Sequence, residues 1–224
     1  MSKSDPALGQ KVHAHLVARG LETPITSKVL EPDDEKIERI TELMAETLDV
    51  LGLDRTDDSL VDTPKRIAKM YVQELFYGLN YDRFPKCTAV DNKITYDELV
   101  VERCTVKSVC EHHFVYFGTA HRPDLSCWVS YIPEDKVLGL SKLSRIVDFF
   151  SRRPQIQERL TAQIAETVKF ITGSEHVGVV MKGQHFCVLT RGVEDADGVT
   201  ITSSLHGGFR TNPDLRSELM SYLT

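Results

Sequence analysis

Four consecutive side chains able to take part in acid–base or metal chemistry lie in the segment SVCEHHFV, residues 108–115. They are Cys110, Glu111, His112 and His113. Cys110 and His113 are separated by two residues, so both side chains can reach one metal ion from a single turn. One Cys-x2-His pair does not by itself establish a metal site, and a third ligand must come from elsewhere in the chain.

The best candidate for the third ligand is Cys187 in the segment QHFCV. If this segment is a strand, His185 and Cys187 stand side by side, because side chains two residues apart point to the same face. Two thiolates and one imidazole suit zinc, and three protein ligands leave the fourth position open for water, as in catalytic sites. Alternatively, Cys187 is a small buried hydrophobic residue, and His112 and His185 are structural or surface histidines. Their position beside candidate ligands favours catalysis, because a zinc-activated water needs a proton acceptor and donor nearby.

The composition indicates a globular protein with a sizeable core. The chain has 224 residues, of which 41% are hydrophobic and 27% charged, and this length suits one or two domains. Its net charge of −6 gives no reason to expect a nucleic acid or an anionic membrane as a partner. Any anion site must therefore be local.

The cysteine pattern and the hydropathy favour a cytoplasmic protein. The five cysteines are odd in number and irregularly spaced, which argues against a disulfide framework. The first twenty residues do not resemble a secretory signal, and no apolar run approaches the roughly 20 residues needed to cross a bilayer. We therefore expect free thiols, available for a metal or for catalysis.

Helical periodicity comes first along the chain, and a mixed pattern follows. Residues 33–52 carry apolar side chains at steps of three and four, which predicts an amphipathic helix. Thr63 and Pro64 suit the N-cap and first position of a second helix, which continues to Gly78. Further predictions are short strands between about 86 and 132, helices from Ser141 and from Pro154 to Gly173, strands at HVGVVM, HFCVL and VTITSSL, and a short C-terminal helix. We interpret this as an N-terminal helical region, residues 1–85, followed by one α+β domain, residues 86–224.

Three segments resemble signature sequences of the GTP cyclohydrolase I family, in the same order and at the same spacing: SVCEHHFV, YIPEDKVLGLSKLSRIVDFFSRRPQIQERLT and QHFCVLTRGV. With DDSLVDTPKRIAKMY and TITSSLHGGF the similarity spans roughly residues 34–210, and VHAHLVARGLETP resembles the extended start of bacterial members. The resemblance implies a T-fold (tunnelling fold) domain, an antiparallel sheet with helices on one face, in a homodecamer of two stacked pentamers. It also implies the hydrolysis of GTP to 7,8-dihydroneopterin triphosphate and formate.

The resemblance also assigns the central residues. The family's zinc ligands fall on Cys110, His113 and Cys187, and its two catalytic histidines fall on His112 and His185. Opening the imidazole ring of a purine requires water to add at C8, and zinc can lower the pKa of a bound water to around 7. Protonation of N7 makes C8 more electrophilic, which is the task we expect of His185. For His112 we expect proton shuttling at the water and at the ribose oxygen.

Cations that match the family's phosphate contacts are scattered along the chain. In GLSK, Ser141 stands where a helix begins, a position whose free N–H groups attract phosphate. Lys142 and Arg145 add positive charge there, although ordinary capping by Ser141 beside two solvated cations is the alternative. Further matches are Arg191, Arg66 and Lys69, each of which alone could be a solvated charge.

Glu158 in PQIQERL is the candidate for reading the base. Its carboxylate can accept hydrogen bonds from the N1–H and amino donors of guanine, a pair that adenine lacks. Gln157 is expected to neighbour it in the pocket. Alternatively, Glu158 is favoured only by the dipole at the start of a helix opened by Pro154.

The chain departs from the family between Phe117 and Tyr131. The segment GTAHRPDLSCWVS is several residues longer than expected, and Thr119 stands where the family has a lysine. We expect residues 118–130 to form a longer hairpin loop.

Three other functions stay open on the residues alone. T-fold relatives make other pterins or reduce a nitrile, the latter with a nucleophilic cysteine and without a Cys-Glu-His-His set. A nucleotide-binding regulator could keep zinc as a structural staple, but structural zinc usually has four protein ligands. A zinc deaminase would need a Pro-Cys-x2-Cys sequence, which this chain lacks.

Overall fold

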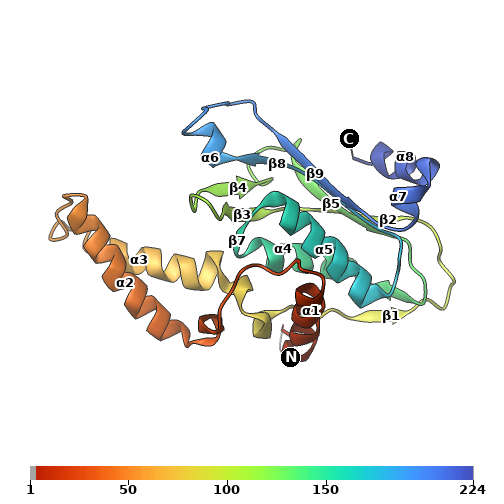
Figure 1. Cartoon of the computed structure of the whole chain (residues 1–224), viewed down its shortest axis with the longest axis horizontal. Coiled ribbons are helices and arrows are strands. Elements are labelled where there is room, and N and C mark those ends of the chain that lie inside the picture. The colour runs from red at the N-terminus through yellow and green to blue at the C-terminus, as the bar shows by residue number, and fades with distance from the viewer. Residues whose placement is uncertain (1–3, 224) are drawn as a thin grey trace.

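One main sheet, the helices that cover it and a projecting helical arm make up the chain (Figure 1). The structure is a computed structural model and describes residues 4–223. The combination of a mostly antiparallel sheet with helices confirms the predicted α+β class. Within the described residues, no helix has both the length and the apolar character needed to cross a bilayer.

The main sheet of the described chain has seven strands, in the order β2-β5-β8-β4-β3-β7, with β9 also paired to β8. The pairs are antiparallel except for β3 and β7, which run parallel. A separate two-stranded sheet joins β1 and β6. The strands are β1 (Ala89–Asp91), β2 (Val100–Cys104), β3 (Lys107–Cys110), β4 (Tyr116–Gly118), β5 (Ser126–Tyr131), β6 (Lys136–Leu138), β7 (Pro154–Gln155), β8 (Val177–His185) and β9 (Thr200–Leu205).

Residues 119–125 connect β4 and β5 outside the sheet. Gly118 pairs with Gln184, and Ser126 pairs with Lys182, so β4 and β5 pair with successive parts of β8. The predicted hairpin is therefore wrong in its pairing, because the two strands bind β8 and not each other. Thr119 is buried, and its hydroxyl accepts a hydrogen bond from the Val106 N–H at 2.9 Å.

Helices α4 (Leu140–Ser151) and α5 (Gln157–Thr172) pack on the main sheet and supply much of the core. The predicted apolar stripe of α4 is buried completely at Leu143, Ile146, Val147 and Phe150. Each such side chain contributes about 1.5–3 kcal/mol of hydrophobic stabilisation when it leaves water.

The start of α5 differs from the prediction. Pro154 does not open the helix, because Pro154 and Gln155 form β7, which pairs with Val109 and Cys110 of β3. Gln157 is the first helical residue, and Gly173 ends the helix in the left-handed conformation with φ 78°.

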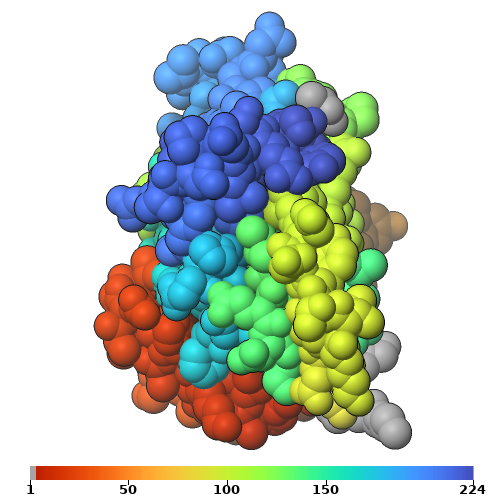
Figure 2. Space-filling model, turned by 90° about the vertical axis from the view of Figure 1, so that its right-hand side faces the viewer, coloured from red at the N-terminus to blue at the C-terminus, as the bar shows by residue number. Residues whose placement is uncertain are grey.

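The N-terminal helix α1 (Pro6–Ala18) belongs to the main body. Asp5 caps it by accepting a hydrogen bond from the Leu8 N–H at 3.0 Å, and Val12 and Leu16 are buried in the main core. Figure 2 shows the red N-terminal segment against the cyan side chains of α5, below the dark-blue C-terminal residues. The division into residues 1–85 and 86–224 stays a prediction, and residues 1–3 and 224 lie outside the described residues.

Helices α2 (Asp33–Val50), α3 (Thr63–Lys69) and the π-helical turn η2 (Met70–Leu75) form an arm that projects from the sheet (Figure 1). The arm has its own small core, built from Ile37, Ala68 and Val72. Thr63 is not the N-cap as predicted: Asp62 takes that position, and Thr63 is already helical.

The other helical segments are η1 (Ser27–Leu30), η3 (Tyr77–Leu79), η4 (Tyr81–Arg83), α6 (Phe186–Leu189), α7 (Gly208–Thr211) and α8 (Pro213–Ser221).

Candidate metal and catalytic site

The CEHH segment forms a tight reversal between β3 and β4. The Cys110 N–H donates to the Val115 carbonyl at 2.8 Å, and the Phe114 N–H donates to the Cys110 carbonyl at 2.9 Å. Phe114 has φ 53°, a left-handed conformation that is strained for a phenylalanine. Its ring packs edge-on against Tyr71 and Phe76 at the base of the arm, with centroids 6.2 and 5.4 Å away. The arm thus helps to hold the reversal.

Cys110, His113 and Cys187 come together as predicted, with one ligand atom from each lying within 4.8 Å of the others. The element that positions Cys187 differs from the prediction, because β8 ends at His185 and Cys187 lies in the short helix α6. The expected strand HFCVL is therefore wrong. Two sulfur donors and one imidazole nitrogen in so small a space fit a zinc ion.

The thiol of Cys187 favours its protonated form in this group. Burial raises the pKa of Cys187, and the neighbouring Cys110 thiol raises it further. A divalent cation between them would reverse this preference, because it stabilises both thiolates. Arg191, one of the predicted phosphate contacts, donates from Nη1 to Nε2 of His113 at 2.9 Å.

His185 lies at the end of β8, fixed on two sides. Its ring stacks on Phe117 at 4.5 Å between centroids, and its Nε2 lies 2.9 Å from Oε1 of Gln157. The Gln157 amide nitrogen lies near three acceptors: the carbonyls of Met181 and Thr200 and the hydroxyl of Thr202. The amide oxygen must therefore face His185, so Nε2 of His185 is the donor. Burial lowers the pKa of His185, which favours its neutral form.

Glu158 and His112 complete the group around the candidate metal ligands. Glu158 is exposed in the first turn of α5, and its negative charge partly offsets the lowering of the His185 pKa. His112 is exposed on the reversal, with Nδ1 3.7 Å from the Cys110 sulfur. The Gln157 side chain is buried and its amide is hydrogen-bonded to protein groups, and its place as a neighbour of Glu158 in a substrate pocket stays a prediction.

The remaining phosphate candidates lie elsewhere in this chain. Ser141, Lys142 and Arg145 belong to the first turns of α4, whose N-cap is Gly139 and not Ser141. The other end of α4 leads into β7 beside Cys110, and a helix of 12 residues is about 18 Å long. Arg66 and Lys69 are exposed on the arm, and Arg66 forms an ion pair with Asp62 at 3.3 Å. One chain therefore brings the metal and base candidates together and leaves most of the cations apart.

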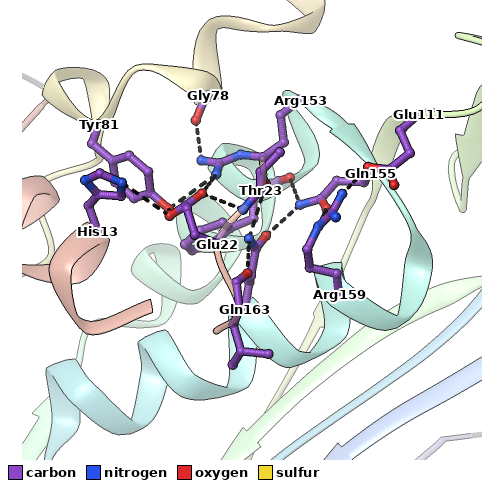
Figure 3. A network of polar contacts seen from close by, with 12 residues as sticks. His13, Glu22, Thr23, Gly78, Tyr81, Glu111, Arg153, Gln155, Arg159 and Gln163 are labelled. Atoms are coloured by element: carbon purple, nitrogen blue, oxygen red, sulfur yellow. Dashed lines mark hydrogen bonds and ion pairs between the residues drawn. The ribbon is translucent and has the colours of Figure 1, made fainter. Parts of the chain in front are cut away.

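Arg159 and Gln155 touch the site without having been predicted from the sequence. Arg159 forms an ion pair with Glu111, the second residue of CEHH, and also donates to the Gln155 side chain at 3.1 Å (Figure 3). Both residues stand in the segment that includes Glu158, but Glu111 is 48 positions away from Arg159. Spacing along the chain gave no signal for this ion pair.

Residues 40–224 match the family profile of GTP cyclohydrolase I. The chain is 49% identical to the GTP cyclohydrolase 1 of Aeromonas salmonicida (strain A449) over 214 residues, covering 95% of this chain and 94% of that protein. It is 48% identical to the GTP cyclohydrolase 1 of Shewanella denitrificans over 221 residues, covering 98% of each. With the profile match and the two near full-length identities, the chain belongs to the GTP cyclohydrolase I family.

Proposed function

We propose that this chain is a zinc-dependent GTP cyclohydrolase I, which hydrolyses GTP to 7,8-dihydroneopterin triphosphate and formate. The observation that carries the proposal is the grouping of Cys110, His113 and Cys187 beside His185 and Glu158. Family membership supports the same activity. Zinc held by these three ligands would supply the Lewis acidity that activates water at neutral pH.

The protein side chains bind the base and move the protons. Glu158 accepts hydrogen bonds from N1–H and the amino group of guanine, which orients C8 toward the three ligands. Because Gln157 occupies Nε2 of His185, Nδ1 is the nitrogen left to take up a proton and pass it to N7. His112, exposed beside Cys110, exchanges protons at the attacking water and the ribose oxygen.

The phosphates need cations from more than one place. Arg191 donates to a nitrogen of His113, so its guanidinium lies beside the metal candidates, where it can bind the triphosphate. The separation of Ser141, Lys142, Arg145, Arg66 and Lys69 from the metal candidates supports sites completed by neighbouring subunits. An apolar groove of about 570 Å³ between the arm and the body, lined by Ile40, Met44, Tyr71 and Phe114, supports assembly. We therefore propose a homodecamer of two pentamers in the cytoplasm.

The test uses serine variants of the two thiol ligands. Cys110→Ser and Cys187→Ser should each lose bound zinc and GTP turnover together, because a neutral hydroxyl is a poor substitute for a thiolate. Zinc is measured by elemental analysis of the purified protein, and turnover by formate release from GTP. Cys87→Ser is the matched control, because Cys87 is a half-buried thiol outside the ligand group. Full zinc content and activity in either ligand variant would contradict the proposal.

A further inference from the structure

The side chain of Glu111 ties the CEHH reversal to helix α5. Glu111 lies between Cys110 and His112, and its carboxylate forms an ion pair with Arg159 (Figure 3). The ion pair is sheltered, with 14% of the Arg159 side chain and 26% of the Glu111 side chain exposed. A sheltered ion pair is screened less by salt than one on the surface, so this contact restrains the reversal.

Arg159 is itself held in place by buried amides. Its Nε donates to Oε1 of Gln155 at 3.1 Å, and the Gln155 amide nitrogen donates to Oε1 of Gln163 at 2.7 Å. Gln163 in turn donates to the Leu21 carbonyl at 2.7 Å. Gln155 and Gln163 are completely buried, and each uses its oxygen and its nitrogen in these hydrogen bonds. The guanidinium thus has a fixed support that reaches the N-terminal segment.

Backbone hydrogen bonds also connect the CEHH reversal to Gln155. Cys110 pairs with Gln155 in the parallel β3–β7 ladder, and the Glu111 N–H donates to the Gln155 carbonyl at 3.1 Å. Gln155 therefore contacts the reversal through its backbone and contacts Arg159 through its side chain. The two routes fix Glu111 at its backbone and at its carboxylate.

We propose that Arg159 is a positioning residue, which holds the Cys110–His113 reversal in the geometry that binds zinc through its ion pair with Glu111. This inference rests on the proposed metal site. Anchoring Glu111 restricts rotation of the two residues beside it, so Cys110 presents its sulfur toward His113 and Cys187 before the metal arrives. Glu111 also neutralises the Arg159 cation, which would otherwise oppose the binding of a divalent cation nearby.

The experiment measures metal affinity in the absence of substrate. Each purified protein is stripped of metal, and Zn²⁺ is titrated in competition with a chromophoric chelator. Arg159→Ala should weaken Zn²⁺ binding about 10–100-fold, the usual cost of losing an outer partner of a metal site. Arg159→Lys should recover only part of this loss, since an ammonium cannot reproduce the two directed contacts to Glu111 and Gln155. The Co²⁺-loaded variants should show altered d–d absorption, because the ligand geometry changes.

Two further variants serve as a control and as a second test of the ion pair between Glu111 and Arg159. Arg55→Ala removes an exposed ion pair with Asp49 on the arm and should leave Zn²⁺ affinity and the Co²⁺ spectrum unchanged. Glu111→Gln keeps the size of the side chain, and it should weaken Zn²⁺ binding even if Arg159→Ala fails to fold. Wild-type Zn²⁺ affinity and Co²⁺ spectra in both Arg159→Ala and Glu111→Gln would overturn the positioning role while leaving the metal site intact. A wild-type chain that binds no Zn²⁺ would overturn the proposed function as well.

Discussion

The amide of Gln157 fixes which ring nitrogen of the catalytic candidate His185 carries the proton. Gln157→Glu would place a carboxylate where the amide oxygen now lies, 2.9 Å from Nε2 of His185. An opposite charge at this distance favours the imidazolium and raises the pKa by about one unit or more. Since burial lowers that pKa in the wild-type chain, the substitution should move the limb of the kcat/KM–pH profile that reports His185 to higher pH.

A second buried glutamine provides the matched control. Gln184 lies 2.8 Å from Nε2 of His121, a histidine outside the ligand group. Gln184→Glu makes the same change beside a histidine with no assigned role, and it should leave the profile in place. Profiles that coincide for wild type and Gln157→Glu would show that a charge at position 157 does not influence the pKa of His185.

Guanine selection should depend on the charge of Glu158. Glu158→Gln turns one acceptor into a donor that faces the donors of the base, and an unmet buried donor costs about 1–3 kcal/mol. The value of kcat/KM with GTP should therefore fall about 5–150-fold. Asp214→Asn is the control, because Asp214 is also an acid in the first turn of a helix. Equal, unchanged kinetics in both variants would leave Glu158 with only a helix-dipole role.

The C-terminal end of helix α5 depends on a glycine. Gly173 has φ 78°, and a Cβ added there would have no neighbouring atom within 4 Å, so Gly173→Ala introduces backbone strain without a clash. Unfolding free energy should fall by about 1 kcal/mol, as measured in urea. Gly173→Asn is the control, since asparagine tolerates the left-handed conformation better than alanine and should lose less stability. Equal losses in the two variants would exclude backbone strain as the cause.

The periodic spacing of apolar residues predicted the helices correctly, because that spacing lies within the helix itself. The stripes of α2 and α4 follow the helical period: α2 folds within two residues of its expected ends, and α4 begins one residue before the expected start. The sequence pattern gave the wrong secondary structure where contacts with a distant segment decide the conformation. Pro154 looks like a helix start, but pairing with β3 makes it a strand, and HFCVL looks like a strand, but the chain turns into α6 after His185.

In the candidate site, too, the sequence predicted some residues and missed those that depend on distant contacts. Cys110 and His113 were paired by their spacing and Cys187 was added by its residue type and the family resemblance; the three ligand atoms do lie within 4.8 Å of one another, and their role as metal ligands stays a prediction. The partner of Glu111 was not identified, because an ion pair 48 residues apart depends on how α5 packs beside β3. The roles of these residues in the reaction stay predictions.

The proposed homodecamer predicts sites shared between subunits, because the cations of one chain are scattered. Arg66→Ala and His112→Ala should each be inactive alone, and they should recover partial activity when co-expressed, because mixed rings contain some sites made from two intact halves. Formate release from the co-purified rings measures the recovery. His112→Ala with His185→Ala is the control pair and should show no recovery, since both residues lie at one site of one chain. Mixed rings without recovery in the first pair, or a monomer by light scattering, would contradict shared sites.

The contacts of the N-terminal segment also constrain how the chain can fold during synthesis. Glu22 meets Arg153 after 131 further residues, and His15 meets Glu166 after 151. At about 5–20 residues per second, the ribosome needs roughly 7–30 s to make the partners of a helix that it has already released. Segment η4 (Tyr81–Arg83) is made earlier and can cover part of α1, but the contacts between α1 and α5 must wait until residues 157–172 are made, so the docking of α1 is completed late in synthesis.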